Sequence, residues 1–102
     1  MKIIAALVDM IRDELEGAEH YAICSEKWKA QYPKLAQRLN ELASVEMQHV
    51  KALHTEAERL ISDYRNEHGD PPEGMLAVYN YEHEKLIKKA AEVKTMIDAF
   101  DD

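Results

Sequence analysis

The sequence predicts an all-α protein in which two long helices form an antiparallel hairpin and a third helix follows. Glycine and proline number only three each in 102 residues, far below their combined share of about 12% in an average protein. Apolar residues recur at alternating steps of three and four, the spacing of one face of a helix. Residues that end helices gather at only two places. We therefore expect three helices, at about 2–30, 33–66 and 71–100, in a single domain 1–102.

The first helix should end before Pro33, because proline disfavours helical backbone in the residue before it and fits the first turn of the next helix. Its expected core-facing stripe comprises Leu7, Ile11, Glu14, Ala18, Tyr21, Ser25 and Trp28. Gly17 lowers helix propensity inside this helix, which indicates close packing at that position. The short turn at residues 31–33 predicts that the second helix folds back antiparallel to the first.

The second and third helices are separated at residues 66–73. Gly69 can end the second helix with a left-handed backbone. Asp70 can then cap the third helix, with Pro71 in its first turn and Glu73 completing a capping box. The expected apolar stripe of the second helix comprises Leu35, Leu39, Leu42, Glu46, His49, Leu53 and Leu60. That of the third comprises Leu76, Tyr79, His83, Leu86, Ala90, Val93, Ile97 and Phe100.

Three helices of this length form a thin layer with little enclosed core. A helix of about 30 residues is roughly 45 Å long at 1.5 Å per residue. Tyrosine, methionine and leucine side chains on a second helix face would remain in contact with water. Self-association of the chain is therefore expected.

The composition excludes several classes of function. The net charge of −7 argues against binding to nucleic acid or to an anionic membrane surface, because both need clustered lysine and arginine. No apolar run approaches the roughly 20 residues that span a bilayer. The apolar stretch after Lys2 reaches a charged residue, Asp9, too early for a signal peptide. Cys24 is the only cysteine, which excludes a disulfide framework and a cysteine-based zinc cluster. A cytoplasmic protein fits these observations.

Four ionisable residues interrupt the apolar stripes: Glu14, Glu46, His49 and His83. A carboxylate on an apolar face carries a large desolvation cost unless it is paired or bound to a metal. The hairpin turn places Glu14 about level with His49, and Glu46 one helical turn away. Glu46 and His49 form a Glu-x-x-His pair, whose members lie on one side of a helix and can reach the same ion. Carboxylate plus imidazole suits iron, manganese or zinc.

Each of these residues also has an interpretation without a metal. If the stripe is rotated by one position, Glu46 and His49 form a solvated surface pair. Glu14 can pair with a lysine or histidine across the hairpin. His83 is either a hydrogen-bonded core histidine or an additional metal ligand.

Further polar residues surround Glu14. Tyr21 is either a core or interface aromatic or a hydrogen-bond partner of a ligand carboxylate. Glu19 is a candidate for an additional ligand or a partner of one, and Asp13 and Glu16 are candidates for an acidic path along which cations approach. Alternatively, these acids form a solvated face. No function is assigned to His20, His54 and His68.

The stretch from Glu14 to Tyr21, followed by Glu46-Met47-Gln48-His49, resembles the ferritin-like superfamily of di-iron carboxylate proteins. Bacterioferritins and rubrerythrins place a ligand glutamate seven residues before a tyrosine on the first helix, and a Glu-x-x-His motif on the second. The resemblance covers about residues 4–64. It implies that Glu14 is a terminal or bridging ligand, Glu46 a bridging ligand and His49 a terminal ligand.

The predicted third helix departs from this pattern. A complete ferritin-like chain has four helices and repeats the ligand set, whereas residues 71–100 contain no Glu-x-x-His, and no fourth helix is predicted. The chain thus carries half a site. Encapsulated ferritins, whose first helix is similar to Glu14-Leu15-Glu16, also carry half of the ligand set in each chain. They complete the site by dimerising. The resemblance implies a homodimer or higher homo-oligomer whose four central helices enclose two metal ions.

We therefore expect a ferritin-like protein that oxidises Fe(II) with dioxygen or peroxide at a di-iron site shared across a homodimer. One alternative is a metal-free helical interaction module, in which Glu14 and His49 form a buried polar pair that fixes the helix register. Another is a zinc- or manganese-binding protein that uses the same ligands for stability and carries out no turnover.

Overall fold

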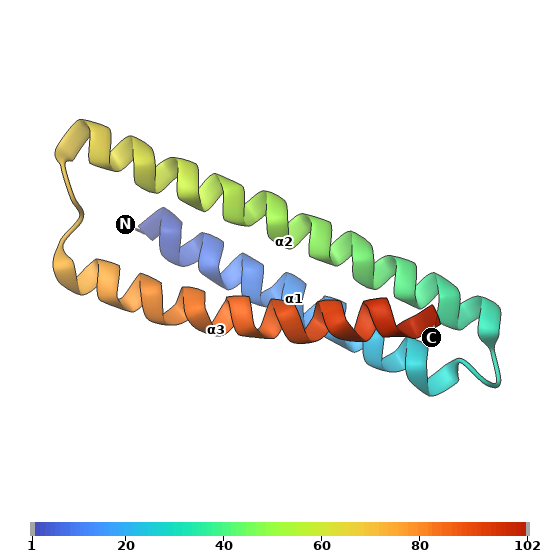
Figure 1. The fold of residues 1–102 in the computed structure, drawn as a ribbon. Coiled ribbons are helices and arrows are strands. Elements are labelled where there is room, and N and C mark those ends of the chain that lie inside the picture. Colours follow the sequence, from blue (N-terminus) through green and yellow to red (C-terminus); the bar gives the residue numbers. More distant parts are fainter. Residues whose placement is uncertain (1, 102) are drawn as a thin grey trace.

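The computed structural model describes residues 2–101, which form three long α-helices joined by two short connections (Figure 1). α1 is Lys2–Trp28, α2 is Pro33–His68 and α3 is Glu73–Asp98, and a short 3₁₀ helix, η1 (Ala99–Asp101), follows. No strand occurs within the described range, so the all-α prediction is confirmed. None of these helices has an apolar stretch long enough to cross a bilayer.

The turn between α1 and α2 agrees with the prediction. α2 begins at Pro33, whose missing amide costs nothing in the first turn of a helix. The backbone amide of Tyr32 donates to the carbonyl of Trp28 at 2.7 Å and closes the end of α1. Figure 1 shows the result, in which α1 and α3 run in one direction and α2 runs in the other.

The connection between α2 and α3 differs from the prediction in one respect. Gly69 ends α2 with a positive φ of 77°, and its amide donates to the carbonyl of Arg65, as expected of a glycine at a helix end. α3, however, begins at Glu73 and not at Pro71. Pro72 disfavours helical backbone at Pro71 and is itself extended, with ψ of 139°. The predicted capping box therefore does not form, and no side chain caps α3.

The buried stripe of α2 is rotated by one position from the predicted one. Leu35 and Leu42 are 51% and 38% exposed, whereas Ala36 and Ala43 beside them are fully buried. Small side chains at the interface let the two helices of the hairpin approach closely, and the larger leucines then lie at its edge. On α1 the predicted Leu7, Ile11, Ala18 and Ser25 are buried, as are Ile4, Val8, Leu15 and Ala22.

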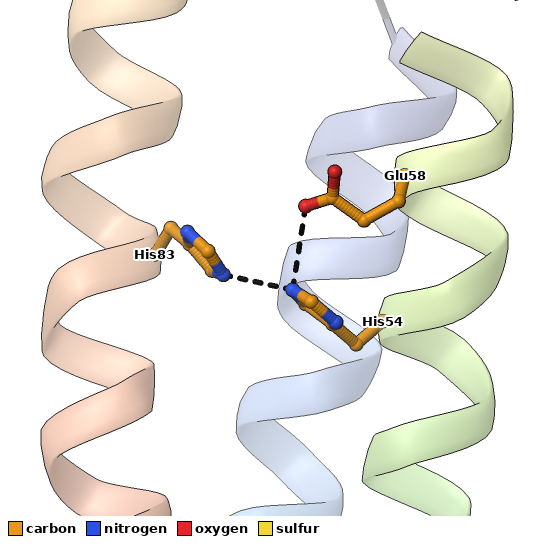
Figure 2. A group of neighbouring side chains, drawn as sticks. All are labelled: His54, Glu58 and His83. Carbon is orange, nitrogen blue, oxygen red and sulfur yellow. Dashed lines mark hydrogen bonds and ion pairs between the residues drawn. The ribbon is translucent and has the colours of Figure 1, made fainter. Parts of the chain in front are cut away.

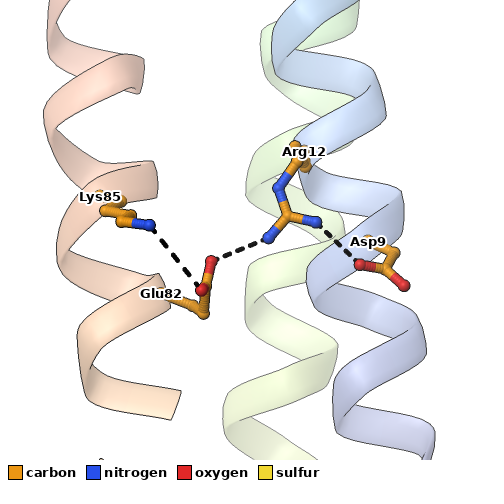
Figure 3. A network of polar contacts seen from close by, with 4 residues as sticks. All are labelled: Asp9, Arg12, Glu82 and Lys85. Carbon is orange, nitrogen blue, oxygen red and sulfur yellow. Dashed lines mark hydrogen bonds and ion pairs between the residues drawn. The ribbon is translucent and has the colours of Figure 1, made fainter. Parts of the chain in front are cut away.

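α3 packs chiefly along α1 and is fastened there by charged groups. Arg12 on α1 contacts Glu82 on α3 at 2.8 Å and also Asp9, while Lys85 approaches Glu82 from within α3 (Figure 3). Farther along, Lys89 of α3 pairs with Glu19 of α1 at 2.5 Å. These bridges fix how α3 is aligned along α1.

A groove of about 540 Å³ separates α2 from α3. Val8, Ile11 and Leu15 of α1 line it together with residues of both other helices, among them His54 and His83. The whole molecule measures 56 × 19 × 18 Å. In a rod only 19 Å wide the core is small, with one cluster of buried side chains (Ile4, Leu7, Val8, Ala57 and Ile61). Large apolar side chains on every helix remain exposed, as the sequence predicts.

Candidate metal centres

The structure brings Glu14, Glu46 and His49 together across the α1–α2 hairpin. One donor atom from each lies within 4.8 Å of the other two. His49 Nδ1 lies 3.3 Å from Glu14 Oε2 and 3.6 Å from Glu46 Oε1. We call this group the hairpin triad. Two carboxylates and an imidazole at these distances could hold a metal ion.

The two carboxyl groups of the hairpin triad shift each other's pKa. The interaction with Glu46 lowers the pKa of Glu14, and the interaction with Glu14, followed by partial burial, raises the pKa of Glu46. Glu46 thus takes up a proton at a higher pH than Glu14 does. A cation that binds both oxygens would displace this proton.

Gly17 leaves room for the Glu46 carboxylate. A Cβ atom built on Gly17 would lie 3.1 Å from Glu46 Oε2, closer than ordinary van der Waals contact. The close packing predicted at this glycine is therefore confirmed, and the group that needs the space is a side chain of the triad. A Cβ atom here would require the Glu46 carboxylate to shift by a few tenths of an ångström.

The hairpin triad opens to solvent. The side chain of His49 is 52% exposed, and those of Glu14 and Glu46 are 30% and 25% exposed. Leu42 and Val45, which precede His49 by seven and four residues, lie on the same side of α2 and are themselves exposed. The triad is therefore bordered by apolar surface that no other part of the described chain covers.

A second group, which we call the clasp triad, joins α2 to α3: His54, Glu58 and His83 (Figure 2). His54 Nε2 lies 2.8 Å from His83 Nε2 and 3.4 Å from Glu58 Oε1. The two imidazole rings lie nearly parallel, with ring centres 4.8 Å apart. The donor atoms again all lie within 4.8 Å of one another, so this set could also hold a metal ion.

Tyr79 supports the clasp triad from one turn before His83. Its hydroxyl donates to Glu58 Oε1 at 3.1 Å, and its ring stacks on that of His83 with centres 5.4 Å apart. Burial of the phenol, followed by the nearby negative charge of Glu58, raises the pKa of Tyr79 to about 12. The phenol therefore stays protonated at neutral pH and holds the Glu58 carboxylate in place.

The remaining predicted site residues lie apart from the hairpin triad or at its margin. His83 joins the clasp triad instead, and Glu19 pairs with Lys89. Tyr21 is half-buried on α1, seven residues after Glu14, while Asp13 and Glu16 are exposed. His83 is half-buried and faces His54 of α2, a partner that the sequence did not predict.

Sequence reasoning assigned no function to His54 or Glu58. The signal that was available is their spacing of four, which places an imidazole and a carboxylate on the same side of a helix. That spacing occurs often by chance, and His83 lies 29 residues from His54 along the chain. Only the position of α3 shows that these three residues meet.

No protein-family model, curated protein or solved structure matches this chain. The resemblance to the ferritin-like superfamily therefore stays a prediction. Across residues 2–101 the protein is a bundle of three long helices that carries two histidine–glutamate groups that could hold metal ions.

Proposed function

We propose that this is a ferritin-like metal-binding protein that oxidises Fe(II) at a di-iron centre shared by two copies of the chain. The observation that carries this proposal is the convergence of two carboxylates and one imidazole, from two helices, within 4.8 Å. Neutral imidazole and carboxylate oxygens bind Fe(II), and the carboxylates offset the charge added when Fe(III) forms.

The number of ligands favours a homodimer. Di-iron sites in four-helix carboxylate proteins use four glutamates and two histidines. One chain offers two glutamates and one histidine in the hairpin triad. An isologous contact between two hairpins, related by a twofold axis, would supply the full set of six.

The surface around the hairpin triad supports the same contact. Leu35, Leu42 and Val45 of α2 are between 38% and 51% exposed, and Met10 of α1, four residues before Glu14, is 47% exposed. A second copy packed against this face would cover apolar side chains and exclude water from the ligands. Both changes favour association, because buried apolar area stabilises an interface and removing water strengthens carboxylate–metal bonds.

The proposed reaction removes one electron from each of two Fe(II) ions. With dioxygen as oxidant, two electrons and two protons convert O₂ to hydrogen peroxide. With peroxide as oxidant, the same two electrons and two protons yield two molecules of water. Asp13 and Glu16, both exposed near Glu14, would raise the local concentration of the Fe(II) substrate.

The test is to replace Glu46, which contacts both other ligands. The protein is purified without a histidine tag, and its metal content, its mass in solution and its rate of Fe(II) oxidation are measured. We expect a dimer that binds two iron ions at the shared centre and oxidises Fe(II). In Glu46→Ala, binding at this centre and oxidation should be lost while helicity by circular dichroism stays unchanged.

Glu41→Ala is the matched control, because Glu41 is an exposed glutamate of the same helix that pairs only with Arg38. This variant should behave as wild type. If Glu46→Ala binds iron at the wild-type ratio, then the assignment of Glu14, Glu46 and His49 as iron ligands is wrong. A wild-type protein that binds zinc there and does not oxidise Fe(II) would overturn the proposed reaction and leave a stabilising metal site.

A further inference from the structure

We propose that the clasp triad is a mononuclear site for a divalent ion of the zinc type, and that the bound ion fastens α3 to α2. The site is separate from the proposed di-iron centre. His54 follows His49 by five residues, which is a rotation of about 140° around α2 at 100° per residue. The two groups therefore face different sides of α2, and either can exist without the other.

The donor atoms of the clasp triad are close to the geometry that zinc needs. Bonds of about 2.0–2.1 Å at tetrahedral angles set two ligand nitrogens about 3.4 Å apart. The nitrogens of His54 and His83 lie 2.8 Å apart, so they need to separate only slightly. The side chains of His54 and Glu58 are 41% and 52% exposed, so there is room beside them for this small movement.

The polar contacts of the clasp triad bring three atoms that can offer lone pairs close together. A neutral His54 has at most one proton on Nε2, yet this atom faces both His83 Nε2 and Glu58 Oε1. The proton can be donated to only one of them, and the other then contributes a lone pair that has no donor from His54. A divalent cation would accept lone pairs from all three groups at once.

Contacts outside the triad hold its members in place. The Tyr79 hydroxyl donates to Glu58 Oε1, and hydrogen bonds of this kind orient metal-binding carboxylates. Glu82, the neighbour of His83, is fixed to α1 by Arg12 at 2.8 Å (Figure 3). This bridge joins α3 to α1 next to the residue that faces α2, His83 (Figure 2).

The position of the site explains what an ion would contribute. α2 and α3 flank an apolar groove of about 540 Å³, and His54 of α2 and His83 of α3 both line it. Two ligands come from α2 and one from α3, so the ion would link the two helices directly. Two histidines and one glutamate leave the fourth position of zinc to water.

The proposal is tested by metal titration of full-length wild type and of His83→Gln. Co²⁺ is the spectroscopic probe, since it takes the place of zinc and absorbs visibly when tetrahedral, and Zn²⁺ is used for thermal unfolding. We expect His83→Gln to bind one Co²⁺ per chain fewer and to lose the tetrahedral spectrum. Zn²⁺ should raise the unfolding temperature of wild type more than that of His83→Gln.

His68→Gln is the matched control, because His68 is an exposed histidine of α2 that contacts neither triad. It should keep the wild-type stoichiometry. Glu58→Gln, which preserves shape, should weaken Co²⁺ binding as well, so a folding defect in His83→Gln alone does not decide the outcome. Unchanged Co²⁺ binding in both triad variants would overturn the proposal.

Glu46→Gln separates this inference from the proposed function. If the clasp triad is an independent site, Glu46→Gln keeps its tetrahedral Co²⁺ spectrum even where iron oxidation is lost. Loss of that spectrum in Glu46→Gln would contradict the independence of the two sites.

Discussion

The hairpin triad and the clasp triad use the same kinds of side chain but depend on different parts of the fold. The hairpin triad lies between two helices joined by a turn of a few residues, so the register of its members follows from counting along the chain. The clasp triad depends on where α3 packs, which is set by contacts of α3 with α1 such as that between Arg12 and Glu82. A short turn thus makes one site predictable, while the other needs the tertiary structure.

The two triads also differ in how complete they are. The hairpin triad is bordered by exposed apolar side chains and holds half of a di-iron ligand set. The clasp triad has its own supporting hydrogen bond from Tyr79 within one chain. Association should therefore matter to the hairpin triad alone.

The largest expected effect comes from Leu42→Glu, which places a charge on the exposed stripe beside the hairpin triad. If two copies share the centre, losing the dimer should weaken metal binding there about 100-fold, because the second ligand set is no longer held nearby. Binding at the clasp triad should not change. Sedimentation and metal titration of the same samples measure both.

Ile23→Glu serves as the control for Leu42→Glu. Ile23 is 51% exposed and lies half a rotation around α1 from Glu14. It should leave the dimer and both sites intact. A monomeric Leu42→Glu that binds iron as tightly as wild type would show that one chain suffices.

Tyr79→Phe should weaken metal binding at the clasp triad about tenfold, because Glu58 loses the hydrogen bond that orients it. The hairpin triad should be unaffected. In wild type, titration of tyrosine absorbance should show one phenol with a pKa of about 12, and this step should be absent from Tyr79→Phe. Equal affinities in the two proteins would show that the phenol does not orient the ligand.

Gly17→Ala should change the stability of the protein and its metal binding in opposite directions. Alanine favours helix over glycine by about 1 kcal/mol, and the flexible Glu46 side chain can move away from the added Cβ. We expect higher resistance to urea but weaker metal binding at the hairpin triad only. Gly74→Ala is the control, since nothing lies within 4 Å of the Cβ it would add. Unchanged metal affinity in Gly17→Ala would show that the carboxylate position is not critical.

The smallest effect concerns the pH dependence of the metal-free protein. The raised pKa of Glu46 means that its contribution to stability is present at low pH and is lost as the pH rises through its pKa in the folded state. The lowered pKa of Glu14 gives a contribution that is lost as the pH falls through its folded-state value. Glu46→Gln should therefore gain stability relative to wild type as the pH rises through the folded pKa of Glu46.

Urea unfolding at a series of pH values measures this difference, with Glu41→Gln as the control. Above the pKa of Glu46 the wild-type protein holds two adjacent carboxylates, whereas Glu46→Gln holds only one. A difference between the two proteins that does not change with pH would mean that the carboxyl groups do not shift each other's pKa.

The sequence alone determined the three helices, the hairpin and the grouping of Glu14 with Glu46 and His49. These follow from local rules: apolar spacing, proline and glycine at the connections, and the fixed rise of a helix. It did not determine which residues of α2 face α1, because alanine and leucine at neighbouring positions both fit an apolar stripe. In the structure the two helices approach closely, and Ala36 and Ala43 are the residues that face α1.

Only the tertiary structure decided that His54, Glu58 and His83 meet. Residues on α2 and α3 come together according to how α3 rotates and slides along α1, and no short turn fixes either quantity. Charged bridges between α1 and α3, together with the buried Val93 and the partly buried Tyr79 and Leu86 of α3, favour one arrangement. The physical reason is that helix periodicity fixes the faces of each helix, whereas packing between helices fixes which faces meet.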